Sequence, residues 1–171
     1  MPTGGNSFEQ SYNAQVAVDA SKQIVVATLV SQSPKDVALL LPVVAQASEN
    51  TGKVPTRVLA DAGYRSEHNL AQLHSLEING YVSLGREGKG ARLPSAACPC
   101  TQGMLRKLKS KRGRAVYRKR KSVVEPVFGW VKRVMGFRTF SLRGLRKVAG
   151  EWSLVCMALN LRRMAVLEGA R

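Results

Sequence analysis

Two kinds of apolar periodicity follow one another in the first half of the chain, and their order limits the folds open to it. Apolar and polar side chains alternate over residues 13–19, and residues 24–30 are rich in β-branched side chains. The polar residues between these segments predict a β-hairpin. Helical and strand-like spacing then predict, in order, a helix at 33–50, a strand at 56–60, a helix beginning at Ser66, a strand at 81–84, and helices at 114–136 (interrupted at Pro126) and 143–167.

Strands and helices mixed in this order predict an α/β fold in which helices flank a sheet. A chain of 171 residues can bury one substantial core. We therefore expect a loose start at residues 1–11 and one domain over residues 12–167. Residues 85–113 are rich in Gly, Lys and Arg and lack a sustained period, which predicts a long basic loop.

The net positive charge comes entirely from the C-terminal part of the sequence. Residues 1–100 carry 8 basic and 8 acidic side chains, whereas residues 101–171 carry 19 basic and 3 acidic ones, which accounts for the formal net charge of +16. Such asymmetry predicts a surface that contacts nucleic acid. No stretch approaches 18 apolar residues, and the N-terminus lacks a basic segment followed by an apolar one. We therefore expect no membrane span and a cytoplasmic, nucleoid-associated protein.

Glu125 is the only acid between Glu87 and Glu151, within a stretch that holds 16 Lys and Arg residues between positions 106 and 147. An isolated carboxylate in a basic surface repels a polyanion unless it has another task, and binding a divalent cation beside phosphate is such a task. The alternative is a helix carboxylate that pairs with Lys121 or Lys132. Because Pro126 follows it, Glu125 is predicted at a cap or kink.

Asp61 comes directly after the predicted strand at 56–60. Open α/β sheets place their ligand-binding groups at the carboxyl ends of strands. Gly63 permits a tight turn there, and Tyr64 can pack against the site. The alternative for Asp61 is a helix N-cap or turn residue.

The cysteines do not predict a metal site. Cys98 and Cys100 form a single C-x-C without a second pair, and Cys156 lies in an apolar helical stretch. His68 and His74 are six residues apart and do not share one helix face. We expect free thiols.

Three blocks of sequence resemble the DDE transposases of bacterial insertion sequences. They are "YNAQVAVDASKQIVVATLVSQSPKD", Asp61 in "ADAGY", and "YRKRKSVVEPVFGWVKRVMGFRTFSLRGLRKV", which contains Glu125. The blocks occur in the family's order from about Tyr12 to Met164. The resemblance is greatest to the group whose glutamate lies in a "VEPVFG" context.

The resemblance implies a ribonuclease H-like mixed sheet flanked by helices and two divalent metal ions, normally Mg²⁺, roughly 4 Å apart. It implies DNA cleavage at a transposon end, followed by strand transfer to target DNA. By position, Asp61 resembles the second acid of the family's triad and Glu125 the third.

The same resemblance suggests DNA-binding residues. Lys132 resembles the lysine of the family's Tyr, Arg, Glu, Lys signature, and Lys121 occupies the arginine position. Tyr117 lies one residue earlier than the signature expects. The full predicted DNA-binding set is Tyr117, Arg120, Lys121, Lys132, Arg133 and Arg138.

The family's first acid has no counterpart in this sequence. It belongs to a strand upstream of the "YNAQVAVD" block, so the resemblance implies an N-terminally truncated form in which the first strand is incomplete. Asp19, in the predicted hairpin turn, is the alternative ligand. We expect such a form to be inactive by itself.

Two further readings remain open from sequence. One is a non-catalytic, basic nucleic-acid-binding protein, which would need neither Asp61 nor Glu125. The other is a transposase remnant that acts as an inhibitor by pairing with a full-length transposase. The expected partners are therefore transposon-end and target DNA, and a second copy of this chain or a full-length transposase.

Overall fold

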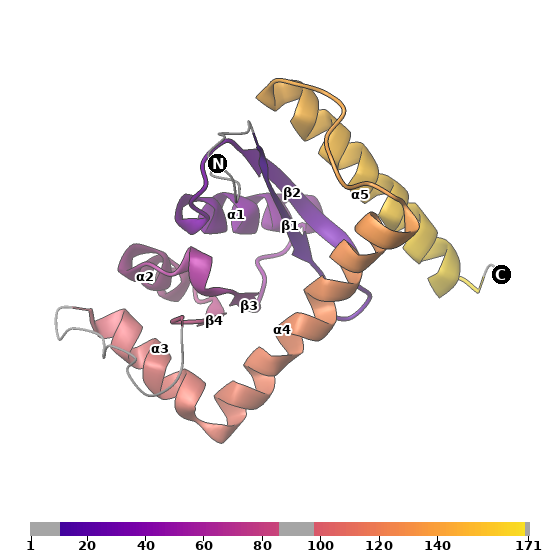
Figure 1. The fold of residues 1–171 in the computed structure, drawn as a ribbon. Coiled ribbons are helices and arrows are strands. Elements are labelled where there is room, and N and C mark those ends of the chain that lie inside the picture. Colours follow the sequence, from indigo (N-terminus) through magenta and orange to yellow (C-terminus); the bar gives the residue numbers. More distant parts are fainter. Residues whose placement is uncertain (1–10, 86–97, 170–171) are drawn as a thin grey trace. The chain divides into compact units, whose positions relative to one another are not determined.

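A computed structural model describes residues 11–85 and 98–169 of the chain. These residues form two compact units, each with its own core (Figure 1). The hairpin unit combines residues up to Asp36 with those from Val123 onward, and the βαβ unit comprises Val37–Ser122. Each unit is described by itself below.

The hairpin unit begins with the strand pair that the sequence predicts. β1 (Asn13–Val18) pairs antiparallel with β2 (Val25–Ser31), with Asn13 opposite Ser31 and a register shift at Ala17/Val18. Asp19 closes the turn, because its Oδ2 accepts hydrogen bonds from the backbone N–H groups of Ser21 and Lys22 and from the Ser21 hydroxyl. The predicted hairpin is confirmed.

α5 (Leu145–Leu167) covers this hairpin and confirms the predicted C-terminal helix. Its core face recurs at intervals of three or four residues, so its members lie on one side of the helix and pack on β2: Val148, Trp152, Cys156 and Leu159. Burying an apolar side chain of this size contributes about 1.5–3 kcal/mol. Burial also raises the pKa of the Cys156 thiol to about 12, so this cysteine packs as a small apolar group.

Two polar side chains of α5 fix its position on the hairpin. Trp152 Nε1 donates to the backbone carbonyl of Gln15 at 3.0 Å. The Asn160 amide pairs with both backbone groups of Val25, accepting from the N–H and donating to the carbonyl, each at 2.8 Å. These bonds satisfy buried or partly buried groups that would otherwise lose their hydrogen bonds to water.

The βαβ unit contains α1 (Leu40–Thr51), β3 (Arg57–Ala60), α2 (Glu67–Ser75) and β4 (Asn79–Val82). β3 and β4 run parallel, with Arg57 opposite Asn79 and Ala60 opposite Val82, so α2 is the crossover helix between them. Ser66 caps α2 as predicted, its hydroxyl accepting from the Asn69 N–H at 3.0 Å. The buried core of the unit is Leu40, Val44, Ala60, Leu70, Leu73, Ile78, Tyr81, Val82, Met104 and Leu108.

Two predicted boundaries were wrong. The first helix begins at Leu40 after a 3₁₀ turn at Val37–Leu39, not at residue 33, because the Asp36 carboxylate accepts from the Asn13 and Gln15 side chains of β1. The strand predicted at 81–84 begins at Asn79. A side chain at Gly80 would approach Leu73 Cδ1 to 2.8 Å, so glycine allows this strand to pack closely on α2.

The predicted basic loop was also wrong where the structure describes it, whereas its residues 86–97 lie outside the described residues. α3 (Pro99–Lys109) and the start of α4 (Lys111–Gly129) occupy positions 99–113. The Glu67 carboxylate caps α3 by accepting from the Cys100 and Thr101 N–H groups. The hydrogen bond from the Thr101 hydroxyl, together with these two, lowers the pKa of Glu67.

One cation of α3 contributes to packing. The Lys107 ammonium donates to the Asn79 side chain and, at 2.7 Å, to the Gly80 carbonyl, and it lies 4.2 Å from the Tyr81 ring centroid. Burial, with Arg57 nearby, lowers the pKa of Lys107. This side chain therefore anchors α3 to β4.

α4 continues through Pro126, so the predicted interruption there was wrong, and Glu125 lies within the helix instead of at a cap or kink. Proline removes the N–H that would bond to the carbonyl four residues earlier, but Val127 and Val131 are buried in the hairpin unit's core and hold the helix in place. The backbone irregularity follows one turn later, as a π-helical turn at Trp130–Val134.

The architecture confirms the α/β class. The four described strands form one antiparallel pair, β1 with β2, and one parallel pair, β3 with β4. Cys98, Cys100 and Cys156 are free thiols, as predicted. Within residues 11–85 and 98–169, no helix is long and apolar enough to cross a membrane.

Candidate active site

Asp61 lies at the carboxyl end of β3, where the parallel strand gives way to a 3₁₀ turn at Ala62–Tyr64. It is the N-cap of that turn, since its Oδ1 accepts the Gly63 N–H at 3.0 Å. Its side chain is 48 % exposed. Asp61 is therefore the cap that the sequence left open as an alternative. Capping occupies one of its carboxylate oxygens, and the other faces a cation.

That cation is Arg120, in the part of α4 that belongs to the βαβ unit. One guanidinium nitrogen lies 4.0 Å from Asp61 Oδ2, and the Arg120 side chain is 24 % exposed. The guanidinium carbon lies 5.7 Å from the ring centroid of Tyr117, which packs against the core of the same unit. The Nε atom is buried and has no hydrogen-bond partner among the described residues. The three side chains form a cluster, named below the Asp61 cluster.

The Asp61 cluster contains two residues of the predicted DNA-binding set, Tyr117 and Arg120. Arg120 follows Tyr117 by three residues, so the two share the same one-residue offset, and it is Arg120 that contacts both Tyr117 and Asp61. Lys121 is exposed on the same helix. The assignment of Lys121 to the arginine position remains a prediction.

Glu125 lies in the part of α4 that belongs to the hairpin unit and is exposed. Among the described residues it makes no ion pair, so the pairing with Lys121 or Lys132 that the sequence left open is not formed. Asp61 belongs to the other unit, and the convergence of the two carboxylates remains a prediction.

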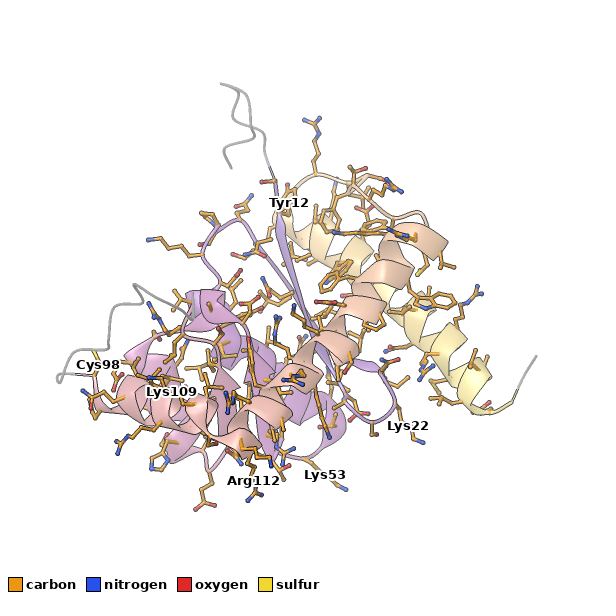
Figure 2. The ribbon with its side chains drawn as sticks, turned by 60° about the horizontal axis from the view of Figure 1, so that its bottom comes forward. Tyr12, Lys22, Lys53, Cys98, Lys109 and Arg112 are labelled. Atoms are coloured by element: carbon orange, nitrogen blue, oxygen red, sulfur yellow. The ribbon has the colours of Figure 1, made fainter. Side chains whose placement is uncertain are left out.

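Each unit carries a stretch of sequence rich in exposed cations. In the hairpin unit, the exposed basic residues between the π-helical turn and the first turn of α5 are Lys132, Arg133, Arg138, Arg143, Arg146 and Lys147. In the βαβ unit, the exposed basic residues of α3 and α4 are Arg106, Lys109, Lys111, Arg112, Arg114, Arg118, Lys119 and Lys121. Lys109 and Arg112 lie on either side of the turn that joins α3 to α4 (Figure 2).

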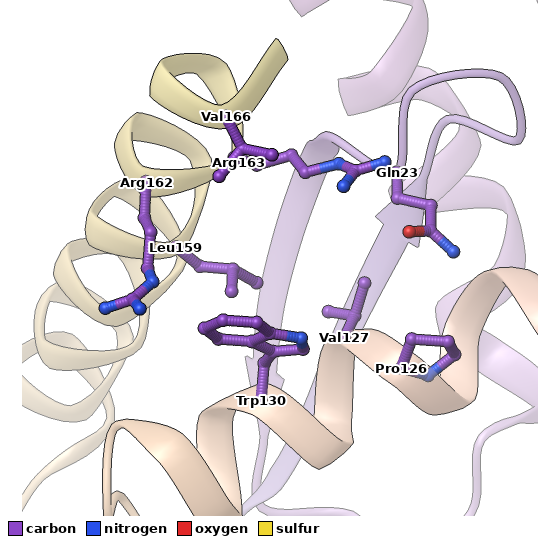
Figure 3. A pocket seen from close by; sticks show the side chains of 8 residues that line it. All are labelled: Gln23, Pro126, Val127, Trp130, Leu159, Arg162, Arg163 and Val166. Atoms are coloured by element: carbon purple, nitrogen blue, oxygen red, sulfur yellow. The ribbon is translucent and has the colours of Figure 1, made fainter. Parts of the chain in front are cut away.

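A cavity of about 100 Å³ lies between α4 and α5 within the hairpin unit. Most of its lining is apolar, and Arg162 lies over the Trp130 ring, with 4.7 Å between the guanidinium carbon and the ring centroid (Figure 3). Arg163 donates to the Lys22 carbonyl at 2.8 Å. Both arginines thus have partners within the hairpin unit.

The family model described as "Transposase DDE domain" matches residues 2–161. The chain belongs to this family. No curated protein and no solved structure matches it. The match confirms the resemblance and makes this a transposition-related catalytic domain, whose family acts on DNA and generally uses divalent metal ions.

Two carboxylates of this transposase domain are chemically suited to bind such an ion. Carboxylate oxygens are the ligands that Mg²⁺ and Mn²⁺ prefer, and Asp61 and Glu125 are both accessible. The described residues contain no group of three or more His, Cys, Asp or Glu side chains that could hold a metal ion. Asp19 already accepts three hydrogen bonds at one oxygen; partial burial raises its pKa, but these bonds outweigh that effect and lower it.

Proposed function

We propose that this transposase domain catalyses metal-dependent DNA cleavage and strand transfer, with Asp61 and Glu125 as metal-binding carboxylates in a ribonuclease H-like arrangement. The observation that carries the proposal is the position of Asp61 at the carboxyl end of a parallel strand, inside the segment that matches the family. Open α/β sheets bind their ligands at this edge. The exposed, unpaired Glu125 within a basic helix supports the second assignment.

Each side chain has a distinct role in this proposal. Asp61 and Glu125 would hold Mg²⁺, which when bound stabilises charge on the attacking and leaving oxygens at phosphorus. Arg120 and Lys121 would pair with DNA phosphates from the βαβ unit, and the Tyr117 ring would orient Arg120. Lys132, Arg133 and Arg138 would contact phosphates from the hairpin unit, which positions the duplex without reading its sequence.

Two carboxylates define a two-metal site incompletely. We expect the 171-residue chain by itself to show little strand transfer, because an error in metal position of about 1 Å costs orders of magnitude in rate. Transposon ends and target DNA are the proposed substrates. A second copy or a longer transposase is the proposed protein partner.

Metal binding can be tested without turnover. Mn²⁺ titrated into the isotopically labelled chain should broaden NMR signals of residues adjoining both Asp61 and Glu125, because a shared paramagnetic ion relaxes nuclei near each of its ligands. Asp61→Asn and Glu125→Gln should each abolish the broadening at both positions. Glu49→Gln, which removes an exposed acid of α1, is the matched control and should change nothing. Broadening around Asp61 that survives Glu125→Gln would refute a shared site.

A further inference from the structure

α5 carries an apolar stripe on the side of the helix that faces away from its own core. Its members are exposed to unusual degrees for large apolar side chains: Leu154 62 %, Met157 52 %, Leu161 60 % and Met164 47 %. Exposed apolar patches on soluble proteins mark interaction surfaces. We propose that this stripe is the site at which α5 pairs, antiparallel, with α5 of a second copy of the chain.

The spacing of the stripe is that of a helix-pairing seam. Its residues are separated by three, four and three positions, the pattern with which two helices interlock their side chains. At 100° per residue the stripe lies roughly 165° around the helix from the core face. α5 therefore holds the hairpin with one side and leaves a second apolar side uncovered within its own unit.

The distribution of charge restricts where two copies of this strongly basic chain can approach one another. Two copies with a net charge of +16 repel one another over most of their surface. The ten residues from Trp152 to Leu161 carry no charge, so two copies can approach along this segment. Alanine at position 158, beside the stripe, leaves room for a neighbouring helix.

The ends of the stripe favour the antiparallel direction. One heptad before Leu154 is Lys147, and one heptad after Leu161 is Glu168, and both are exposed. Antiparallel pairing centred between residues 157 and 158 brings Lys147 of one copy toward Glu168 of the other at both ends. A parallel pair would set lysine against lysine and glutamate against glutamate. The contact is isologous and closes as a dimer.

This inference does not depend on the metal site, and sedimentation velocity of the full chain tests it. At about 0.3 M salt, where the Debye length is below ~8 Å, the wild-type chain should be a dimer in the tens-of-micromolar range. Leu161→Glu should weaken the dimer by at least roughly 100-fold, because the symmetric contact loses two buried leucines. Val54→Glu, which alters a 60 % exposed valine elsewhere, should leave it intact.

A charge exchange tests the direction of pairing. Lys147→Glu and Glu168→Lys should each weaken the dimer several-fold, and the double variant should restore it. A wild-type chain that stays monomeric under these conditions would overturn the proposal. So would equal weakening by Leu161→Glu and Val54→Glu, or a double variant weaker than either single one. Far-ultraviolet circular dichroism confirms that each variant is folded, which the exposure of all these positions leads us to expect.

Discussion

Removal of Arg143 and Arg146 should change how DNA binding responds to salt by a calculable amount. Both residues lie in the exposed basic stretch of the hairpin unit, which holds six cations between positions 132 and 147. Neither contributes to the core, so alanine at both positions should leave the fold intact. Each phosphate contact contributes about −0.9 to the slope of log affinity against log salt concentration, because it releases a condensed counterion.

The magnitude follows from this count. Six contacts give a slope of about −5.4, and a rise from about 50 to 200 mM salt then weakens binding about 1,800-fold. Four contacts in the Arg143→Ala, Arg146→Ala variant give a slope of about −3.6 and a loss of about 150-fold. Contacts from the βαβ unit would steepen both slopes equally, so the difference of about 1.8 is the quantity to measure.

Fluorescence anisotropy of a labelled duplex, titrated at several salt concentrations, measures both slopes. The matched control is Lys35→Ala with Lys53→Ala, which removes the same charge from exposed positions outside the basic segment. This control should keep the wild-type slope. Equal reductions by the two pairs would mean that net charge alone governs binding, and a wild-type slope near zero would refute phosphate contact by these residues altogether.

Two further predictions concern the Asp61 cluster and α5. Arg120→Gln should raise the Mn²⁺ affinity at Asp61 about tenfold, because it removes a cation that repels the ion. The control Arg118→Gln should leave this affinity unchanged. Equal Mn²⁺ midpoints for the two variants in the NMR titration would contradict the prediction. Asn160→Ala should reduce the free energy of unfolding by about 2–4 kcal/mol, since it removes two hydrogen bonds and leaves the first residue of β2 unsatisfied. Urea denaturation, followed by circular dichroism, measures the free energy of unfolding. The control Ser153→Ala, at an exposed position, should change it by less than about 0.5 kcal/mol. A similarly small change for Asn160→Ala would refute a stabilising role for the hydrogen bonds between Asn160 and Val25.

Elements with a local signal were predictable from the sequence. The β-hairpin follows from the alternation of apolar and polar residues and from the polar turn between its strands. α5 follows from apolar residues at helical spacing, several of which form its buried face. Asp61 was placed at a strand end because the apolar run of β3 stops there. These features depend on neighbours within a few positions, which is the range over which periodicity carries information.

α3 was missed because its stabilisation comes from distant residues. Its N-terminus is capped by Glu67, more than thirty positions earlier, and its last turn is anchored when Lys107 reaches Gly80. Met104 and Leu108 are its buried apolar residues, and the surrounding cations and glycine obscure their four-residue spacing. The predicted interruption of the helix at Pro126 was wrong for the same reason. The burial of its neighbour Val127 outweighs the lost backbone hydrogen bond.

The residues of the candidate site likewise differ in whether the local sequence or only the fold reveals them. An acid after a strand and an acid in a basic helix can each be recognised alone. Arg120 gains significance only from the fold, which sets its guanidinium 4.0 Å from Asp61. A cation there opposes the binding of a divalent metal ion at the same oxygen. We therefore expect Arg120, a predicted DNA-binding residue, also to affect how readily Asp61 binds a metal ion. Its two effects must be separated by measuring metal binding and DNA binding on the same Arg120→Gln variant.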